Sequence, residues 1–118
     1  MMIELSSAWT PTQDEFDLFA RISGDDNPIH VDPEFSSRTA FGRTVSHGML
    51  IYTKLWGLLT AAHPDVTQTG QSMKFPNPCY TDEQVDLVIS GECPGTLSVR
   101  AIRSADGAEL LVGETEVA

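Results

Sequence analysis

The pattern of hydrophobic and polar positions changes at Pro64, from a long apolar segment before it to a strand period after it. Gly48–Ala62 is apolar nearly all round, interrupted by a Thr-Lys pair, and His63-Pro64 follows it. This pattern predicts a helix that is enclosed in the interior of the protein. Beyond Pro64, β-branched residues in partial alternation, separated by turns such as Asp106-Gly107, predict four strands. These strands are expected at Val66–Phe75, Gln84–Gly91, Thr96–Arg103 and Ala108–Val117.

The N-terminal region carries the signals for a short strand and one helix. Met2–Ser7 reads as a first strand. Thr12 and Glu15 have the spacing of a capping box at a helix start, and Thr10 followed by Pro11 is an alternative start. Ser23-Gly24 should end this helix. Its apolar face is expected to consist of Phe16, Phe19 and Ala20.

The segment Gly24–Gly42 is rich in Gly, Asp, Asn, Pro and Ser, which predicts a loop with one short helix near Pro33–Thr39. Irregular segments on a rigid scaffold are where binding and catalytic residues concentrate. One enclosed helix followed by hairpin-linked strands predicts an α+β fold, with a curved antiparallel β-sheet wrapped around the central buried helix. At 118 residues the chain is expected to form a single domain over residues 1–118.

The net charge of −10, with only seven Lys and Arg residues scattered along the chain, argues against a nucleic-acid partner. The same charge would oppose a ligand that carries phosphates unless a local basic rim overcame it. The longest apolar stretch is too short to span a bilayer, and the first residues lack the features of a secretory signal. A cytoplasmic protein without a membrane segment is therefore expected. Cys79 and Cys93 show neither a zinc-site spacing nor a disulfide framework.

Asp25 and His30 are the first candidates for chemistry. They lie on either side of Asn27-Pro28, where the proline fixes its own φ and favours an extended residue before it. A chain bent at that point can present the carboxylate and the imidazole to one small volume. The two groups could then hold one water molecule, with one group taking its proton and the other orienting it or returning a proton.

Gly48 provides a second candidate through its backbone. It lies where the central helix should begin, so its N–H is among the donors left unpaired at a helix N-terminus. Helped by the helix dipole, this group can hydrogen-bond a carbonyl oxygen that becomes negative during a reaction. The absence of a side chain lets a ligand approach the backbone closely.

These segments resemble the signature of a known family. The string Ser-Gly-Asp-x-Asn-Pro-Ile-His at Ser23–His30, followed by His-Gly-Met at His47–Met49, is similar to the motif of MaoC-like (R)-specific enoyl-CoA hydratases. The segment Ser72–Pro78 is similar to the strand motif that follows the central helix in that family. The resemblance covers nearly the whole chain in order. It implies a single hotdog fold and a homodimer.

The resemblance also implies roles for individual residues. Asp25 and His30 match the catalytic pair, and Gly48 matches the glycine that supplies an oxyanion-hole amide. Asn27 is the implied organiser of the site and, with His47, Gly48 and Met49, belongs to the expected substrate-binding positions.

The implied reaction is the reversible addition of water to a trans-2-enoyl thioester, which gives an (R)-3-hydroxyacyl thioester. The thioester carbonyl is polarised at Gly48, water held by Asp25 and His30 attacks the β-carbon, and a proton reaches the α-carbon on the same face. The resemblance implies no metal and no redox cofactor. Coenzyme A, or the pantetheine arm of an acyl carrier protein, is implied as part of the substrate. The expected partner is thus an acyl-CoA or acyl carrier protein thioester, without nucleic acid or membrane.

Several of these residues also have a purely structural interpretation. Asp25–Pro28 could form a polar turn whose side chains cap backbone groups. For His47 a structural or positioning role is the preferred interpretation, and Asp26 is expected to face solvent. Phe41 and Trp56 are expected in the core or along a tunnel, where the bulk of Trp56 could shorten the acyl pocket.

Two rival functions stay open at this point. A hotdog acyl thioesterase would also use a carboxylate and an oxyanion amide, but it would hydrolyse the thioester. A non-catalytic domain that binds acyl thioesters would need no acid–base pair. The pairing of Asp25 with His30 favours the addition of water. Acyl chain length, the choice between coenzyme A and a carrier protein, and the pathway are not encoded in these patterns.

Overall fold

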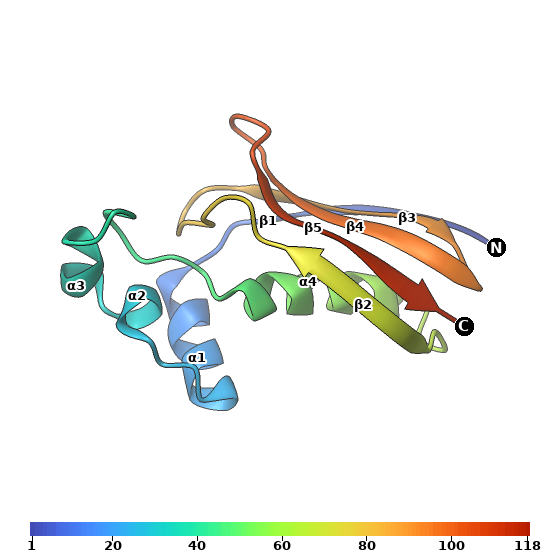
Figure 1. Cartoon of the computed structure of the whole chain (residues 1–118), viewed down its shortest axis with the longest axis horizontal. Helices are drawn as coiled ribbons and strands as arrows, with labels where there is room; N and C mark the ends of the chain where they lie inside the picture. The colour runs from blue at the N-terminus through green and yellow to red at the C-terminus, as the bar shows by residue number, and fades with distance from the viewer.

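The computed structural model describes residues 1–118, which form four helices and five strands (Figure 1). The helices are α1 (Gln13–Ser23), α2 (Pro28–Val31), α3 (Pro33–Ser37) and α4 (Gly48–Ala62). The strands are β1 (Met2–Trp9), β2 (Gln68–Lys74), β3 (Val85–Glu92), β4 (Gly95–Arg103) and β5 (Glu109–Val117). The strands make one layer with α4 on one side of it, and the other three helices gather at one end of the molecule (Figure 1). None of the helices combines the length and the hydropathy needed to cross a membrane.

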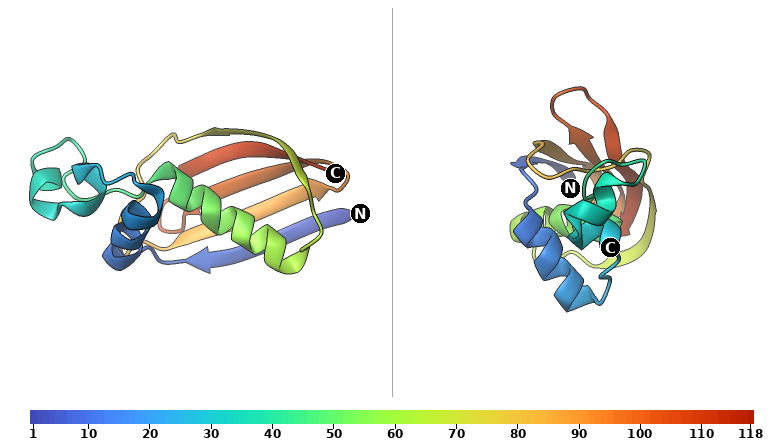
Figure 2. Two further views of the ribbon diagram at one scale, coloured as in Figure 1. Left: turned by 90° about the horizontal axis from the view of Figure 1, so that it is seen from below. Right: turned by 90° about the vertical axis from the view of Figure 1, so that its left-hand side faces the viewer.

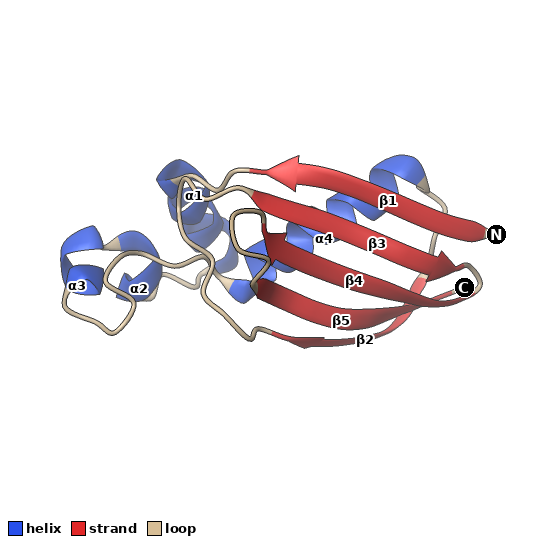
Figure 3. Cartoon of the chain, turned by 90° about the horizontal axis from the view of Figure 1, so that it is seen from above, coloured by secondary structure: helices blue, strands red, loops and turns tan.

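All five strands belong to one antiparallel sheet with the order β1-β3-β4-β5-β2 (Figure 3). Hairpins join β3, β4 and β5, and β1 and β2 form the two edges. The strands β5 and β2 approach closely at Gly113, where a Cβ atom would lie 2.2 Å from the main-chain oxygen of Ser72. Pairing of β2 with the sheet therefore requires a residue without a side chain at this position.

Alternate strand residues point toward α4 and form the core. On β3, Val85, Leu87 and Ile89 are buried, and the residues between them are more exposed. This is the period-two pattern that the sequence predicts. Helix α4 packs against β1, β3, β4 and β5 on the inner face of the curved sheet (Figure 2). The predicted α+β arrangement, a sheet wrapped around a central helix, is confirmed.

Helix α4 has the predicted bounds, but it is buried along one face only. Leu50, Ile51, Leu55 and Leu59 face the core and are between 1% and 5% exposed. Met49, in contrast, is 50% exposed. The predicted burial of this helix is thus confirmed on the side of the sheet, whereas the opposite side is exposed in a single chain. A sheet of this size covers one side of a helix, and the opposite side needs a second covering element.

Helix α1 begins and ends where the sequence signals lie. Thr12 Oγ1 accepts a hydrogen bond from the Glu15 N–H, and the Glu15 carboxylate accepts one from the Thr12 N–H, so the predicted capping box is present. Gly24 ends the helix with a left-handed φ of 80°, which places Asp25 directly after the turn. Of the expected apolar face, Phe16 and Ala20 are buried and Phe19 is half-buried.

The segment between α1 and α4 contains two short helices, although the sequence predicts one. Helix α3 lies within the expected range, whereas α2 lies where the composition predicts a loop. Helix α2 forms because the Asn27 side chain accepts a hydrogen bond from the Ile29 N–H at 3.1 Å and Pro28 occupies the first helical position. A helix of four residues is too short to show a periodic pattern, so periodicity could not reveal it.

Candidate active site

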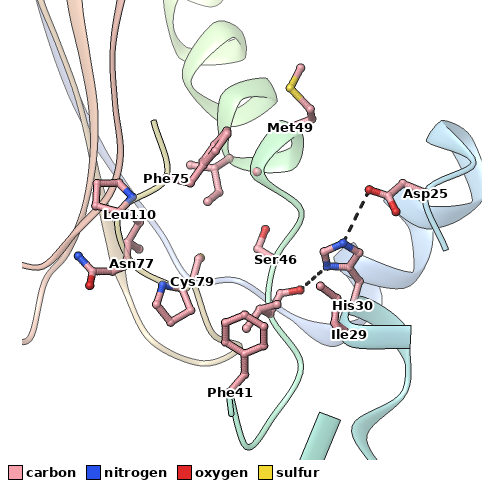
Figure 4. Close-up of a pocket in the computed structure, with 15 residues that line it drawn as sticks. Asp25, Ile29, His30, Phe41, Ser46, Met49, Phe75, Asn77, Cys79 and Leu110 are labelled. Carbon is pink, nitrogen blue, oxygen red and sulfur yellow. Dashed lines mark hydrogen bonds and ion pairs between the residues drawn. The ribbon is translucent and has the colours of Figure 1, made fainter. Parts of the chain in front are cut away.

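A pocket of ≈ 440 Å³ opens at the N-terminal end of α4 (Figure 4). Its walls come from Asp25 and α2, from the segment that leads into α4 and the first turn of α4, from the segment that follows β2, and from β5. Of the predicted site residues, Asp25, His30, Gly48 and Met49 line this pocket. Asn27 and His47 do not line it.

Asp25 and His30 face each other across one side of the pocket (Figure 4). Nε2 of His30 lies 3.7 Å from Oδ2 of Asp25, which is longer than a direct hydrogen bond. The imidazole is buried, whereas the Asp25 side chain is 57% exposed. The structure thus brings the two side chains together across the turn, as their spacing predicts. At this separation one water molecule could hydrogen-bond to both.

Neighbouring main-chain groups fix the orientation and the tautomer of His30. Its Nδ1 lies 2.8 Å from the carbonyl oxygen of Val45. Because a carbonyl oxygen only accepts hydrogen bonds, Nδ1 carries the proton. In the neutral ring, Nε2 is then the free acceptor and faces Asp25. Helix α2 is held in place by Gln13 of α1, whose side-chain amide donates a hydrogen bond to the His30 carbonyl at 2.9 Å.

His47 lies behind His30, away from the pocket lining. Its ring stacks on the His30 ring, with centroids 3.8 Å apart and 24° between the planes. His47 Nε2 donates a hydrogen bond to the main-chain oxygen of Asp25 at 2.8 Å, and Nδ1 has no hydrogen-bond partner. Burial lowers the pKa of His47 below its ordinary value, so this ring is neutral at pH 7. The geometry agrees with a positioning role for His47 and not with direct contact to a substrate.

The main-chain N–H groups of Gly48 and Met49 begin the first turn of α4 and make no hydrogen bond within the protein. Such unpaired donors at a helix N-terminus can bind an oxygen that carries negative charge. The ring of Phe75 packs directly on Gly48, where a Cβ atom would lie 2.6 Å from Phe75 Cζ. A side chain at this position would therefore force either the Phe75 ring or the start of α4 to shift.

Asn27 organises α2 rather than the pocket surface. Its side chain is exposed and its oxygen is used by the hydrogen bond to the Ile29 N–H. By capping the helix that carries His30, Asn27 acts on the site indirectly. The prediction of an organising role agrees with this geometry, whereas the grouping of Asn27 with substrate-binding residues does not.

The far wall of the pocket includes residues that the sequence does not assign to the site, among them Cys79 and Leu110, and Ser46 lies between this wall and His30 (Figure 4). The Ser46 N–H donates a hydrogen bond to the Cys79 carbonyl at 2.8 Å, which joins two segments distant in sequence. Burial raises the pKa of the Cys79 thiol to about 12, so the thiol is protonated at neutral pH and is a poor nucleophile. The one sequence signal for this wall is the motif at Ser72–Pro78, whose last residues line the pocket.

Three other residues can be compared with their predictions. Phe41 lines the pocket, and Asp26 is exposed, as expected. Trp56 does not line the pocket but packs against the core. It lies two helical turns beyond Gly48, about 12 Å along the axis of α4. The idea that Trp56 shortens this pocket is therefore wrong for a single chain.

Asp25, His30 and His47 bring donor atoms within 4.8 Å of one another, which raises the question of a metal ion. An imidazole lone pair lies in the plane of its ring, so two stacked rings direct their lone pairs side by side rather than toward one point. In addition, Nδ1 of His30 and Nε2 of His47 already donate to carbonyl oxygens. The arrangement therefore lacks the converging donors that metal sites use.

Residues 2–106 match the family model described as MaoC like domain. The chain belongs to this family. The resemblance predicted from Ser23–His30 and His47–Met49 is thereby confirmed.

Relatives of this MaoC-like chain carry related names. An (R)-specific enoyl-CoA hydratase of Aeromonas caviae is 40% identical over 73 residues, which cover 60% of this chain and 54% of that protein. A 3-hydroxyacyl-thioester dehydratase Y of Mycobacterium tuberculosis is 32% identical over 107 residues, which cover 86% of this chain and 37% of that protein. The chain thus spans about half or less of the length of these curated relatives.

Solved structures place the MaoC-like chain among hotdog folds. The structure of the (R)-hydratase from A. caviae involved in PHA biosynthesis is 31% identical, covers 98% of this chain and 92% of that chain, and superposes with a TM-score of 0.88. The unliganded R-hydratase PhaJ1 from Pseudomonas aeruginosa, at 24% identity and a TM-score of 0.83, covers 99% of this chain and 78% of that chain and has the same fold. The predicted single hotdog fold is confirmed.

Proposed function

We propose that this MaoC-like chain is a hydro-lyase that reversibly adds water to trans-2-enoyl thioesters of coenzyme A or acyl carrier protein, forming (R)-3-hydroxyacyl thioesters. One observation carries the proposal. The carboxylate of Asp25 and the imidazole of His30 face each other at 3.7 Å, in the same pocket that exposes free N–H groups at the start of α4. Water addition to an enoyl thioester requires this combination of an acid–base pair and a donor for the carbonyl oxygen.

The thioester carbonyl oxygen accepts a hydrogen bond from the N–H at the start of α4, where Gly48 lets the substrate approach the backbone. This bond withdraws electrons from the conjugated alkene and makes the β-carbon electrophilic. It also stabilises the enolate oxygen that forms when the β-carbon is attacked. The helix dipole of α4 adds to the stabilisation, because its positive N-terminal end lies next to the thioester oxygen.

Water between Asp25 and His30 supplies both parts of the addition. One of the two acceptors, the Asp25 carboxylate or the unprotonated Nε2 of His30, removes a proton from the water as its oxygen bonds to the β-carbon. The other acceptor orients the water. The proton then passes from the pair to the α-carbon, so that hydrogen and hydroxyl add to the same face. The dehydration of an (R)-3-hydroxyacyl thioester follows the same steps in reverse.

The apolar lining of the pocket supports a substrate with an apolar portion next to the reacting bond. Phe41, Met49 and Phe75 are large apolar residues at the pocket and are between 41% and 50% exposed. The printed names of relatives agree with this chemistry, since they include (R)-specific enoyl-CoA hydratase and 3-hydroxyacyl-thioester dehydratase. The proposal involves no metal or redox cofactor, which stays a prediction, as does the cytoplasmic location.

Incubation of the purified chain with crotonyl-CoA tests the proposal. Hydration removes the conjugated enoyl absorbance without releasing free thiol, and chiral analysis should identify (R)-3-hydroxybutyryl-CoA. Release of free coenzyme A at the same rate as loss of absorbance would instead identify a thioesterase. Binding of crotonyl-CoA without either change would identify a non-catalytic domain. A series of enoyl thioesters of increasing length, on coenzyme A and on carrier protein, would then define the substrate.

We also propose that the active form is a homodimer. Helix α4 is apolar on both faces, but the sheet of its own chain covers only one of them, and Met49 is half exposed at the pocket. A second copy on this face would remove apolar surface from water. Light scattering coupled to size-exclusion chromatography should give twice the mass of one chain, and the mass of a single chain would contradict the proposal.

A further inference from the structure

His47 contacts three parts of the site. Through Nε2 it donates a hydrogen bond to the main-chain oxygen of Asp25 at 2.8 Å. The face of its ring stacks on His30 at a centroid distance of 3.8 Å. Its backbone is the N-terminal cap of α4, directly before Gly48. One residue thus touches the carboxylate segment, the imidazole and the helix that supplies the oxyanion donor.

We propose that His47 is a positioning residue, which sets the separation of Asp25 and His30 and holds both in a fixed relation to the Gly48 amide. It does so without contacting the substrate, since it is 2% exposed and does not line the pocket. The inference rests on the proposed hydratase function and names a residue on which that function depends.

The surroundings of His47 restrict its ring on the side away from His30. Phe19 makes an edge contact with the ring, with centroids 4.9 Å apart and planes at 62°, and Phe16 makes a second edge contact at 6.5 Å. Both phenylalanines belong to α1, which is anchored by its capping box. The ring of His30 is therefore supported by a second ring that is itself fixed by the core.

Packing alone does not explain why residue 47 is a histidine and not an apolar aromatic residue. Nδ1 of His47 is buried without a hydrogen-bond partner, which costs free energy that a phenylalanine would not incur. The compensation is the hydrogen bond from Nε2 to the Asp25 carbonyl, because an apolar ring could not make it. The hydrogen bond fixes the main chain at Asp25. The Asp25 side chain itself is largely exposed and makes no direct hydrogen bond.

A neutral ring at this position also suits the proton transfer. His30 becomes a cation whenever it holds the proton taken from water, and a second cation stacked on it would oppose that step. Burial keeps the pKa of His47 below its ordinary value, so His47 stays uncharged at neutral pH. His47 can thus support the ring of His30 without competing for its proton.

Two substitutions separate the two contacts. His47→Phe keeps a flat ring that can stack on His30 but removes the donor to Asp25. His47→Gln keeps an N–H donor at the position of Nε2 but removes the ring. His63→Phe is the matched control, because His63 lies at the far end of α4 outside the pocket lining.

We expect His47→Phe to lower kcat for crotonyl-CoA by about 10- to 100-fold, because small displacements of reacting groups have effects of this size. The KM should change by less than about threefold, since the substrate is not contacted, and the pH profile of kcat/KM should shift, since the environment of His30 changes. His47→Gln should retain more activity than His47→Phe but less than wild type. His63→Phe should match wild type in all three measurements.

Wild-type kcat and an unchanged pH profile in a folded His47→Phe would overturn the proposal, even if thermal stability fell. If His47→Phe does not fold, His47→Gln decides the question by the same two measurements. The NMR titration of the His30 ring in wild type and in each variant tests the positioning separately from activity. An inactive wild type would refute the proposed function alone, whereas an identical His30 titration in wild type and variants would refute the positioning role alone.

Discussion

Nε2 of His30 faces Oδ2 of Asp25 at 3.7 Å, and the hydrogen bond of Nδ1 to the Val45 carbonyl leaves this Nε2 unprotonated in the neutral ring. Two acceptors at this distance can both hydrogen-bond one water molecule, so either can accept a proton while the other orients the oxygen. The catalytic assignment depends on this relationship. It can be tested on each partner separately.

Asp25→Asn and His30→Ala should each lower the turnover of crotonyl-CoA by at least about 10², as loss of acid–base assistance does. Both proteins should retain the circular dichroism spectrum of wild type. Asp26→Asn is the matched control for charge, because Asp26 is exposed next to Asp25 and does not line the pocket. A rate near that of wild type in either site variant would remove that residue from the mechanism.

Gly48→Ala should lower kcat/KM by about tenfold or more, because the added Cβ would lie 2.6 Å from Phe75 Cζ and either the ring or the start of α4 must shift. Steady-state kinetics with crotonyl-CoA measure the effect. Adding Phe75→Leu to this variant should restore part of the loss by relieving the contact. If the double variant were no better than Gly48→Ala, the clash with the ring would not be the cause.

Gly57→Ala serves as the control for a helical glycine, because a Cβ at Gly57 would meet nothing within 4 Å. Within one chain this change should stabilise α4 by about 0.5–1 kcal/mol in denaturant unfolding. Gly57 is exposed on the face of α4 that the proposed homodimer would cover, so kcat/KM is compared with wild type only after light scattering shows the same dimer content.

Asn27→Ala should lower kcat by about tenfold through the displacement of His30, since the variant loses the cap of α2. The free energy of unfolding should fall by only about 1 kcal/mol, the usual effect of losing a helix cap. Asn27→Asp should preserve activity, because aspartate caps a helix as well as asparagine does. Unchanged kinetics in Asn27→Ala would indicate that α2 holds its position without the cap.

Glu15→Gln should destabilise the protein at pH 7 by about 1–2 kcal/mol through loss of charge-assisted hydrogen bonds. Burial by itself raises the pKa of Glu15, but hydrogen bonds from Lys54 and Trp9 outweigh it and hold the pKa below the ordinary 4.5. The folded-state pKa is therefore the lower one, so the contribution of Glu15 is complete above about 4.5 and is lost as the pH falls through the folded pKa. Denaturant unfolding from pH 3 to 7 measures the difference.

Asp14→Asn is the matched control for Glu15→Gln, because Asp14 is an acidic residue in the same first turn and is exposed. The unfolding curves of wild type and Glu15→Gln should converge at the acid end of this range. A difference that stayed constant with pH would assign the effect of Glu15 to packing rather than to charge.

The sequence predicts the elements that local signals specify. The bounds of α4, the capping box of Thr12 and Glu15, and the alternation of β3 all follow from periods or dipeptides within a few residues. The approach of Asp25 to His30 is likewise a local event, because the proline between them restricts the turn.

The far wall of the pocket could not be predicted, because it depends on tertiary contacts. The hydrogen bond from the Ser46 N–H to the Cys79 carbonyl, and the position of Leu110 on β5, arise only when the sheet closes over α4. The stacking of His47 on His30 has the same origin, since nothing in their spacing indicates that two rings will lie face to face. The half exposure of α4 reflects the area of the sheet and not the composition of the helix.

The placement of α2 affects the temperature at which the activity is lost. This short helix packs on α1 and α3, whereas α4 packs on four strands of the sheet. Although side-chain and main-chain hydrogen bonds hold α2, a one-turn segment outside the sheet can detach at a free-energy cost below that of global unfolding. On heating, His30 should therefore leave its place while the sheet is still intact, and catalysis should cease at a lower temperature than the loss of β-structure.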